Sequence, residues 1–359
     1  MTTLIIFILV LGILILTHEW GHFIAARRSG LTVEEFGFGF PPRIFSIKRG
    51  ETLYSINLLP LGGFVKILGE DGNEPDNPKS FSSKPVGIRG LIIIGGVFMN
   101  FLLAALLLII GFYIGLPQLI DKDNESLAKN IEIQIVAVRD NSPAQNAGIK
   151  IGDVIKYIKS GNKNIVINEI LTFQENTNNS KGEEITIAVQ RGKKIFEINA
   201  APRINPPEGE GALGIALVKT GIIFYPWHKS FWLGTKSAFV ISWEIVKGFG
   251  SLLKNLITSG KVPQNISGPV GIAVLTNQAA DLGFIYLLQL VAMISLNLAV
   301  LNLIPFPALD GGRLLFLGLE KIKGSKVNPK IENAIHSIGI ILLLSLIVLI
   351  TYKDILRLK

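Results

Sequence analysis

The sequence contains no cysteine, and this absence excludes several kinds of chemistry. A chain without thiols forms no disulfide, offers zinc no thiolate ligand and has no cysteine nucleophile. Clusters of basic residues are also lacking, although the 359 residues carry a net charge of +8. Because lysine and arginine are spread along the chain, we expect no nucleic-acid partner and assign the charge to lipid headgroups and a solvated domain.

The pattern of a signal peptide is lacking too. The apolar N-terminus has neither a basic region before it nor a small-residue cleavage site after it, so we expect a retained helix. What the sequence has instead is apolar residues, which make up 49% of the chain and give a mean hydropathy of +0.47. This composition is typical of a membrane protein.

Long apolar stretches define the expected spans. The stretches that are long enough to cross a bilayer as helices are residues 4–28, 91–116, 284–304 and 334–350. The second stretch carries Gly95, Gly96 and Asn100, a small and partly polar face suited to close helix packing. Residues 222–262 are rich in aromatic side chains but have a charge every few residues, so we expect a helix that lies in the membrane interface.

The first apolar stretch contains the pattern His-Glu-x-x-His at His18, Glu19 and His22. On a helix, a spacing of four places both imidazoles on one face, about 6 Å apart along the axis. Two such imidazoles can bind one Zn²⁺, and the neighbouring carboxylate can serve as the general base of a metalloprotease. Chance is the alternative, but an unpaired carboxylate at membrane depth costs several kcal/mol and usually serves function.

A His₂ zinc site needs a third protein ligand, for which Asp310 is our first candidate. Pro305 and Pro307 cannot continue the third span, so the chain unwinds and delivers Asp310 in an irregular segment. If residues 117–283 stay on one side of the membrane, the first and third spans end on the same face. The argument fails if residues 231–257 cross the membrane.

Other interpretations of these residues stay open. Glu34 and Glu35 are closer in sequence to the first span and form a minority alternative for the third ligand. His228 and His336 are poorer candidates, because the first lies beside the far interface and the second is early in the fourth span. Asp310 could also be the N-cap of the following helix.

Residues 29–90 carry turn and strand signals. The segment 34–45 is aromatic and interrupted by glycine and proline, and 52–67 is expected to form two short strands around residues 60–63. Either a cytosolic hairpin or a sheet that dips into the headgroups is compatible with this pattern.

Residues 131–218 are polar and alternating, as in a soluble domain. The expected elements are strands at 131–138, 152–158, 183–191 and 194–202 and helices at 142–148 and 168–177. The turn at 142–149 and the following Gly152-Asp153-Val154-Ile155 resemble a circularly permuted bacterial PDZ domain. The segment GALGIALV at 211–218 is similar to the Gly-Leu-Gly loop and peptide-binding strand of such a domain. Such a domain binds extended peptide by strand addition, although a purely steric plug carries nearly equal weight.

Larger motifs resemble the site-2 protease family, in its RseP-type bacterial branch. They are HEWGH, GFGF at 37–40, the PDZ-like insert, SGPVGI at 267–272 and NLIPFPALDGG at 302–312. The resemblance implies Zn²⁺ held by His18, His22 and Asp310, with Glu19 as base and Asn302 as a polar group at the substrate or oxyanion. It also implies a membrane-reentrant β-structure built from GFGF and the 52–67 hairpin. The chain holds one PDZ-like unit, whereas longer members hold two.

The expected fold is therefore a polytopic α-helical membrane protein with about four transmembrane helices, a membrane-associated β-hairpin and an inserted α/β PDZ-like domain. The expected domains are an N-terminal membrane domain (1–116), an extracytoplasmic PDZ-like domain (117–221), an interfacial helix and loop (222–283) and a C-terminal membrane domain (284–359).

The resemblance implies an intramembrane zinc metalloprotease of the bacterial inner membrane, with its active site near the cytosolic face. Its partners would be membrane lipid and single-pass membrane proteins, such as an anti-sigma factor or a remnant signal peptide. A non-enzymatic PDZ-bearing scaffold is the alternative, but it leaves the metal-binding pattern without a role. A metal transporter would need ionisable residues along several spans, and the second and fourth offer almost none.

Overall fold

The computed structural model describes residues 2–160, 163–192, 194–259 and 268–357. The chain divides into two compact units. The first unit comprises Met1–Ile109, Trp232–Gln278 and Leu288–Lys359, and the second comprises Ile110–Phe231 and Ala279–Leu287.

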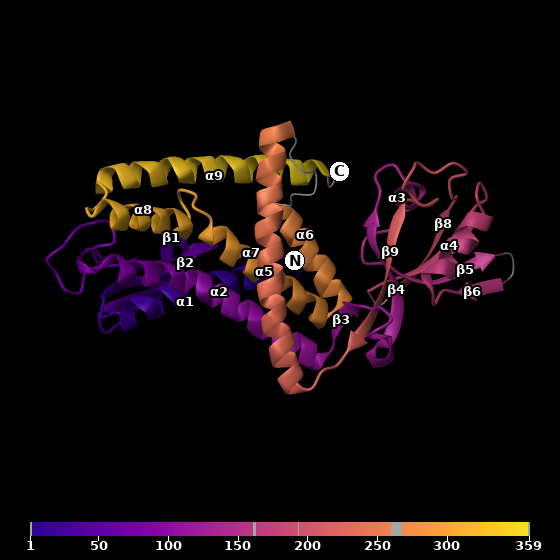
Figure 1. Cartoon of the computed structure of the whole chain (residues 1–359), viewed down its shortest axis with the longest axis horizontal. Helices are drawn as coiled ribbons and strands as arrows, with labels where there is room; N and C mark the ends of the chain where they lie inside the picture. Colours follow the sequence, from indigo (N-terminus) through magenta and orange to yellow (C-terminus); the bar gives the residue numbers. More distant parts are fainter. Residues whose placement is uncertain (1, 161–162, 193, 260–267, 358–359) are drawn as a thin grey trace. The chain divides into compact units, whose positions relative to one another are not determined.

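Helices dominate the first unit (Figure 1). The long helices of the chain are α1 (Thr2–Arg28), α2 (Val86–Ile114), α5 (Trp227–Ser259), α6 (Pro269–Leu282), α7 (Phe284–Leu303), α8 (Asp310–Lys323) and α9 (Pro329–Arg357). Among the described residues, α1, α2, α7 and α9 are long and apolar enough to cross a membrane, which confirms the four expected spans. The charged helix α5 does not meet that criterion.

Some helix boundaries differ from the sequence-based expectation. The motif SGPVGI at 267–272 contains glycine and proline, yet helix α6 begins within it at Pro269; Ser267 lies outside the described part. Helix α8 continues to Lys323, and α9 begins at Pro329, before the expected start of the fourth span at residue 334. In each case, charged or small residues that look like a loop in sequence form the end of a helix.

Strands β1 (Val33–Arg49) and β2 (Thr52–Ile67) form a sheet that differs from the predicted hairpin. Residues 35–38 of β1 lie between two parts of β2. They pair with 63–66 on one side, running antiparallel, and with 53–56 on the other side, running parallel. Phe36, for example, has both Val65 and Tyr54 as partners. The two ends of β2 thus flank β1 and do not pair with each other in the described register, which corrects the hairpin centred on 60–63. Gly37 permits this arrangement, because a Cβ there would collide with the ring of Phe64.

The second unit contains an antiparallel sheet of seven strands around one apolar core. Its strands are β3 (Leu116–Leu119), β4 (Lys129–Val138), β5 (Val154–Ser160), β6 (Lys163–Val166), β7 (Ile185–Arg191), β8 (Lys194–Ala200) and β9 (Ile215–Ile223). They follow the order β3-β9-β4-β5-β7-β8, with β6 on β5. Helices α3 (Pro143–Asn146) and α4 (Ile170–Asn179) complete the unit. The short strands β3 and β6 were not expected, because four residues are too few to show a period.

Small residues bring α1 and α2 together in the first unit. A Cβ on Gly95 would lie 2.7 Å from the backbone oxygen of Gly21, so neither position has room for a side chain. The expected small face of α2 therefore packs directly on the turn of α1 that carries the His-Glu-x-x-His pattern. Farther along α2, Ala104 and Ala105 pack with Ala238 of α5 in a separate apolar cluster.

Candidate active site

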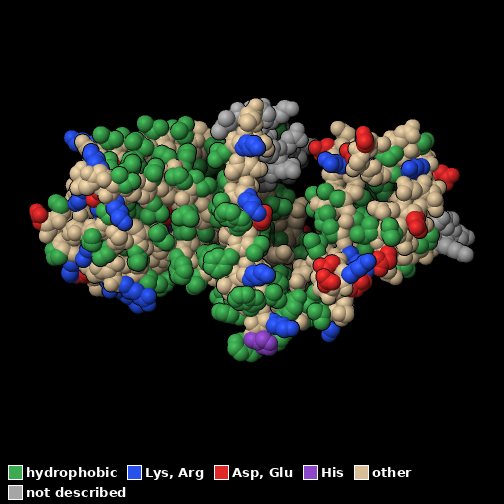
Figure 2. All heavy atoms as spheres, viewed as in Figure 1, with side chains coloured by type: hydrophobic (Ala, Val, Ile, Leu, Met, Phe, Trp, Pro, Cys, Tyr) green, Lys and Arg blue, Asp and Glu red, His purple; other side chains and the backbone are tan. Residues whose placement is uncertain are grey.

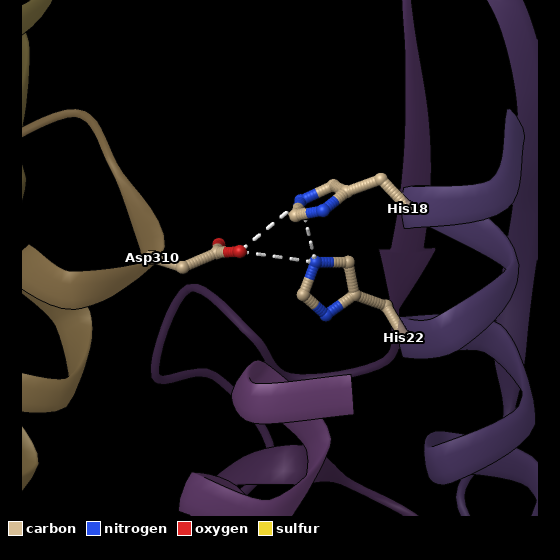
Figure 3. A group of neighbouring side chains, drawn as sticks. All are labelled: His18, His22 and Asp310. Atoms are coloured by element: carbon tan, nitrogen blue, oxygen red, sulfur yellow. Dashed lines mark hydrogen bonds and ion pairs between the residues drawn. The ribbon is translucent and has the colours of Figure 1, made fainter. Parts of the chain in front are cut away.

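Three side chains from distant parts of the sequence meet in the first unit: His18 and His22 of α1 and Asp310 of α8. Figure 3 shows the two imidazoles on successive turns of α1, with the carboxylate pointing at them from the opposite side. Oδ2 of Asp310 lies 3.1 Å from Nε2 of His18 and 3.3 Å from Nε2 of His22. The two Nε2 atoms are 3.2 Å apart. The three donor atoms therefore form a nearly equilateral triangle.

Neighbours on α2 orient both imidazoles. Nδ1 of His22 donates a hydrogen bond of 2.9 Å to the backbone oxygen of Ile92. The side-chain amide of Asn100 lies 3.4 Å from Nδ1 of His18, and its Oδ1 atom has no partner in the described part. Turning the amide over would offer that oxygen to the ring as an acceptor. With Nδ1 protonated in both rings, both Nε2 lone pairs are available to a metal.

Gly96 leaves the space that the two rings occupy. A Cβ at this position would collide with Nε2 of His22 and lie 2.7 Å from Cε1 of His18. Gly96 is thus required by the imidazoles, whereas Gly95 is required by the packing of α2 on α1. Sequence reasoning identified Gly96 and Asn100 as packing residues and missed that both contact the histidines.

The chain before Asp310 is irregular, as expected, but Asp310 itself is the first residue of α8 and Leu309 is the N-cap. The expectation of an irregular position and the alternative of an Asp310 N-cap are therefore both wrong. Ala308 has a left-handed backbone with φ of 86°, a conformation that is strained for a residue with a Cβ. Its N–H donates to Nδ1 of His336 at 3.1 Å, so α9 holds the turn that presents Asp310.

These residues fit a zinc ion. Tetrahedral zinc binds imidazole nitrogen and carboxylate oxygen at about 2.0–2.2 Å, which places ligand atoms about 3.3 Å apart. The observed triangle of 3.1, 3.2 and 3.3 Å matches that separation. Oδ2 of Asp310 is buried without a hydrogen-bond donor in the described part, a costly state that a cation would relieve. Three protein ligands would leave the fourth position open, as in catalytic zinc sites.

Glu19 lies beside this triangle and against strand β2. It follows His18 directly on α1 and is half-buried. A Cβ built on Gly63 of β2 would lie 3.0 Å from Cγ of Glu19 and 2.9 Å from Ile15. The last part of β2 therefore runs within contact distance of the carboxylate-bearing turn of α1.

The model of peptidase family M50 matches residues 6–346. The chain belongs to this family. It is similar to the zinc metalloprotease RasP of Oceanobacillus iheyensis, with 31% identity over 446 residues and all of both chains covered. It is also 30% identical over 438 residues to the regulator of sigma-W protease RasP of Bacillus subtilis, with 99% of each chain covered. RasP of Bacillus licheniformis is 32% identical over 442 residues, again across both whole chains.

Membership in family M50 confirms the resemblance to site-2 proteases and identifies the chain as an intramembrane zinc metalloprotease. A non-enzymatic scaffold is therefore excluded as its main role. Zinc is the metal that the donor set fits and that the relatives' names carry.

Ion pairs tie the Asp310-bearing helix of this M50 peptidase to its neighbours. Arg313 lies one turn after Asp310 and pairs with Glu70, in the turn that follows β2. The Arg313 side chain is 44% exposed, and the adjacent Glu70 carboxylate raises the pKa of Arg313. Near the end of α8, Glu320 pairs with Arg89 of α2 at 2.5 Å, and both side chains are at least 87% buried. Sequence reasoning missed these pairs, because their members are far apart in the chain.

Other sequence candidates lie outside the triangle. The carboxylate of Glu34 pairs with Lys66 at 2.7 Å, and that of Glu35 pairs with Arg43 at 2.6 Å, so neither serves as the third member. His228 is exposed in the first turn of α5. Asn302 is half-buried in the last turn of α7, where its side chain has no hydrogen bond to another described residue.

Proposed function

We propose that this M50 peptidase hydrolyses peptide bonds within the transmembrane segments of single-pass membrane proteins. This proposal is supported chiefly by one observation: His18 and His22 lie on the apolar helix α1, Asp310 of α8 faces them, and the edge of β2 lies beside Glu19. An anti-sigma factor or a remnant signal peptide is a suitable substrate, since one relative is named for its role in regulating sigma-W. The proposed location is the bacterial inner membrane, with the site near the cytosolic face.

The proposed roles follow from the positions of the side chains. His18, His22 and Asp310 would hold Zn²⁺, while Asn100 and Ile92 keep the rings oriented. When bound, zinc polarises the scissile carbonyl and makes water a nucleophile near neutral pH. Glu19 accepts the proton of the attacking water and returns it to the leaving amine. Asn302 would contribute a polar group to the substrate or oxyanion, a role inferred from the family motif alone.

The experiment that tests this function uses the purified protein in vesicles with a reporter that has one transmembrane helix. We expect two products, with the cut inside the reporter's apolar segment as located by mass spectrometry. A zinc chelator should stop the reaction, and added zinc should restore it. Cuts confined to soluble parts of the reporter would contradict the proposal.

A helical substrate must be held extended before its carbonyl can be attacked, and its freed backbone groups need partners in lipid. The end of β2 offers such an edge. N–H groups alternate between the two edges of a strand. Leu68 N–H bonds Thr32 on the β1 side, whereas Ile67 N–H points to Glu70 on the other side. Val65 N–H therefore points outward as well, away from β1 and next to Gly63.

Val65→Pro should lower turnover about two- to tenfold, because it removes one edge donor without removing a hydrogen bond to β1. Zinc content should stay unchanged. Val65→Ala is the matched control, since it keeps the N–H and trims the same side chain. Cleavage rates of a panel of reporters measure the effect, and those with glycine or asparagine in the segment should be cut fastest because they unwind most easily. Equal rates for the proline and alanine variants would rule out substrate pairing at this edge.

The domain assignment stays part of the proposal: a PDZ-like domain at 117–221, outside the cytosol, between membrane domains at 1–116 and 284–359. A groove between α4 and β9 supports a PDZ-like role, with a volume of about 330 Å³ and the loop 211–214 at its end. An extended peptide would fit there by strand addition. Deleting 117–221 separates two roles: broader cleavage indicates exclusion of bulky substrates, and loss of cleavage indicates recruitment.

Single cysteines test the orientation, since the chain has none of its own. Lys122→Cys should react with an impermeant maleimide in intact cells, and Ser325→Cys should react after permeabilisation alone. Both positions are exposed, so failure to react cannot be ascribed to burial. Reaction of both in intact cells would overturn the proposed topology.

A further inference from the structure

Helix α5 carries four lysines, and the three that lie in the first unit form a single file: Lys236, Lys247 and Lys254. The spacings of eleven and seven residues correspond to about three and two helical turns, so the three side chains share one face. The row is about 27 Å long. All three lysines are exposed. Figure 2 shows basic side chains in a line along this helix, with hydrophobic side chains beside them.

The opposite face of α5 packs on the spanning helices. Ala238 is fully buried against Ala104 and Leu108 of α2. A Cβ on Gly234 would lie 2.6 Å from the backbone of Ile109, which shows how closely the helices approach. Because these contacts fix the rotation of α5 about its own axis, the lysine row faces away from the bundle.

Acidic side chains of the protein neutralise little of the positive charge of this lysine row. Glu244 is the one acidic residue in α5, and its carboxylate pairs with Lys247 at 2.8 Å. Lys236 and Lys254 have no ion-pair partner within the described part of the chain. The face thus presents a net positive charge that an external anion can neutralise.

Large apolar side chains lie on the flank of the same row. Trp232, Phe239 and Trp243 are 68%, 62% and 60% exposed. The ammonium group of Lys247 lies 5.9 Å from the ring centre of Trp243. Exposed tryptophan next to lysine is typical of a surface at the membrane interface, where rings reach the acyl chains and ammonium groups reach the phosphates.

We propose that the lysine row of α5 binds the headgroups of anionic phospholipids such as phosphatidylglycerol. The exposed aromatic side chains favour lipid over an acidic protein as the partner. They run along the same length of helix as the lysines, and lipid offers acyl chains to the rings and phosphates to the ammonium groups. Each lysine is far enough from the next to meet a separate headgroup. This inference concerns lipid binding and does not depend on the proposed peptide hydrolysis.

Tryptophan fluorescence gives a direct test, because three of the four tryptophans of the chain lie on α5. A Trp20→Phe, Trp227→Phe background leaves Trp232 and Trp243 as reporters. The protein is placed in phosphatidylcholine vesicles with about one phosphatidylglycerol in ten lipids, and either lipid carries brominated chains that quench fluorescence. We expect brominated phosphatidylglycerol to quench well above its share of the lipid. Added soluble glycerol phosphate should not reduce that quenching.

Changing Lys236, Lys247 and Lys254 to glutamine should remove this preference, by up to about fivefold for each lysine. Lys122→Gln, Lys150→Gln and Lys181→Gln together form the matched control, since they remove the same charge from exposed positions of the second unit. The control should keep the preference, and high salt should weaken it. Quenching by phosphatidylglycerol in proportion to its share, or equal loss in both triple variants, would overturn the proposal. The first of these outcomes would point to an acidic protein as the partner.

Discussion

Replacing Glu19 by glutamine should leave zinc bound and lower peptide hydrolysis by about a hundred- to ten-thousandfold, the usual contribution of a general base. Glutamine keeps the size of the side chain beside Gly63 but cannot accept the proton of the attacking water. The three donor atoms of His18, His22 and Asp310 are untouched by this change. Metal analysis and reporter cleavage on the same purified sample measure both quantities.

Variants of the proposed zinc ligands should behave differently from Glu19→Gln. His18→Ala, His22→Ala and Asp310→Ala should each lower zinc content together with turnover, because each removes one corner of the triangle. If Asp310→Ala kept full zinc and full activity, Asp310 would not be a ligand, whatever its distance from the imidazoles. Loss of zinc in Glu19→Gln would show that the carboxylate holds the metal and does not act as base alone.

Gly96→Ala should be nearly as damaging, although it adds a single methyl group outside the ligand set. The new Cβ would occupy the position of both imidazole edges, so the rings or α2 must move. Displacements of about 1 Å at a catalytic centre can cost about a hundredfold in rate. We expect a loss of that order in cleavage and a clear loss of zinc affinity.

Gly87→Ala in the same helix is the matched control, because a Cβ there has no atom within 4 Å. Alanine favours helix over glycine by about 1 kcal/mol, so neither variant should unfold α2 for lack of helix propensity. Thermal stability of both proteins in detergent checks this. Normal zinc binding in Gly96→Ala would mean that α1 and α2 can separate without disturbing the histidines.

Much of the site could be predicted from the sequence, because its chemistry is encoded at short range. The spacing of His18 and His22 fixes their common face on any helix. Asp310 required a longer argument, which counted membrane crossings and used the prolines that end α7. That argument works in a membrane protein since each span has two possible directions and no others. The structure places the three side chains together, and their roles as ligands stay a proposal.

The remainder depends on contacts that have no local signal. Residues 35–38 pair with both ends of β2. The alternation of apolar and polar residues in 52–67 does not specify this path of the chain, so the expectation of a simple hairpin was wrong. The contact of Asn100 with His18 and the pair of Arg313 with Glu70 join residues that are distant in sequence. A sequence pattern can show that such a polar residue lies in an apolar or membrane-associated segment, but it does not show which residue is its partner.

The three side chains of the triangle are synthesised at different times, which has a consequence for the newly made protein. The two histidines lie in α1 and leave the ribosome first, whereas Asp310 follows α2, the whole second unit and α7. A nascent chain therefore holds two of the proposed metal donors and the proposed base before the third donor has been made. If the three side chains bind zinc as proposed, a complete zinc-binding set exists after α8 has been synthesised and not before, so we expect an unfinished chain to be inactive.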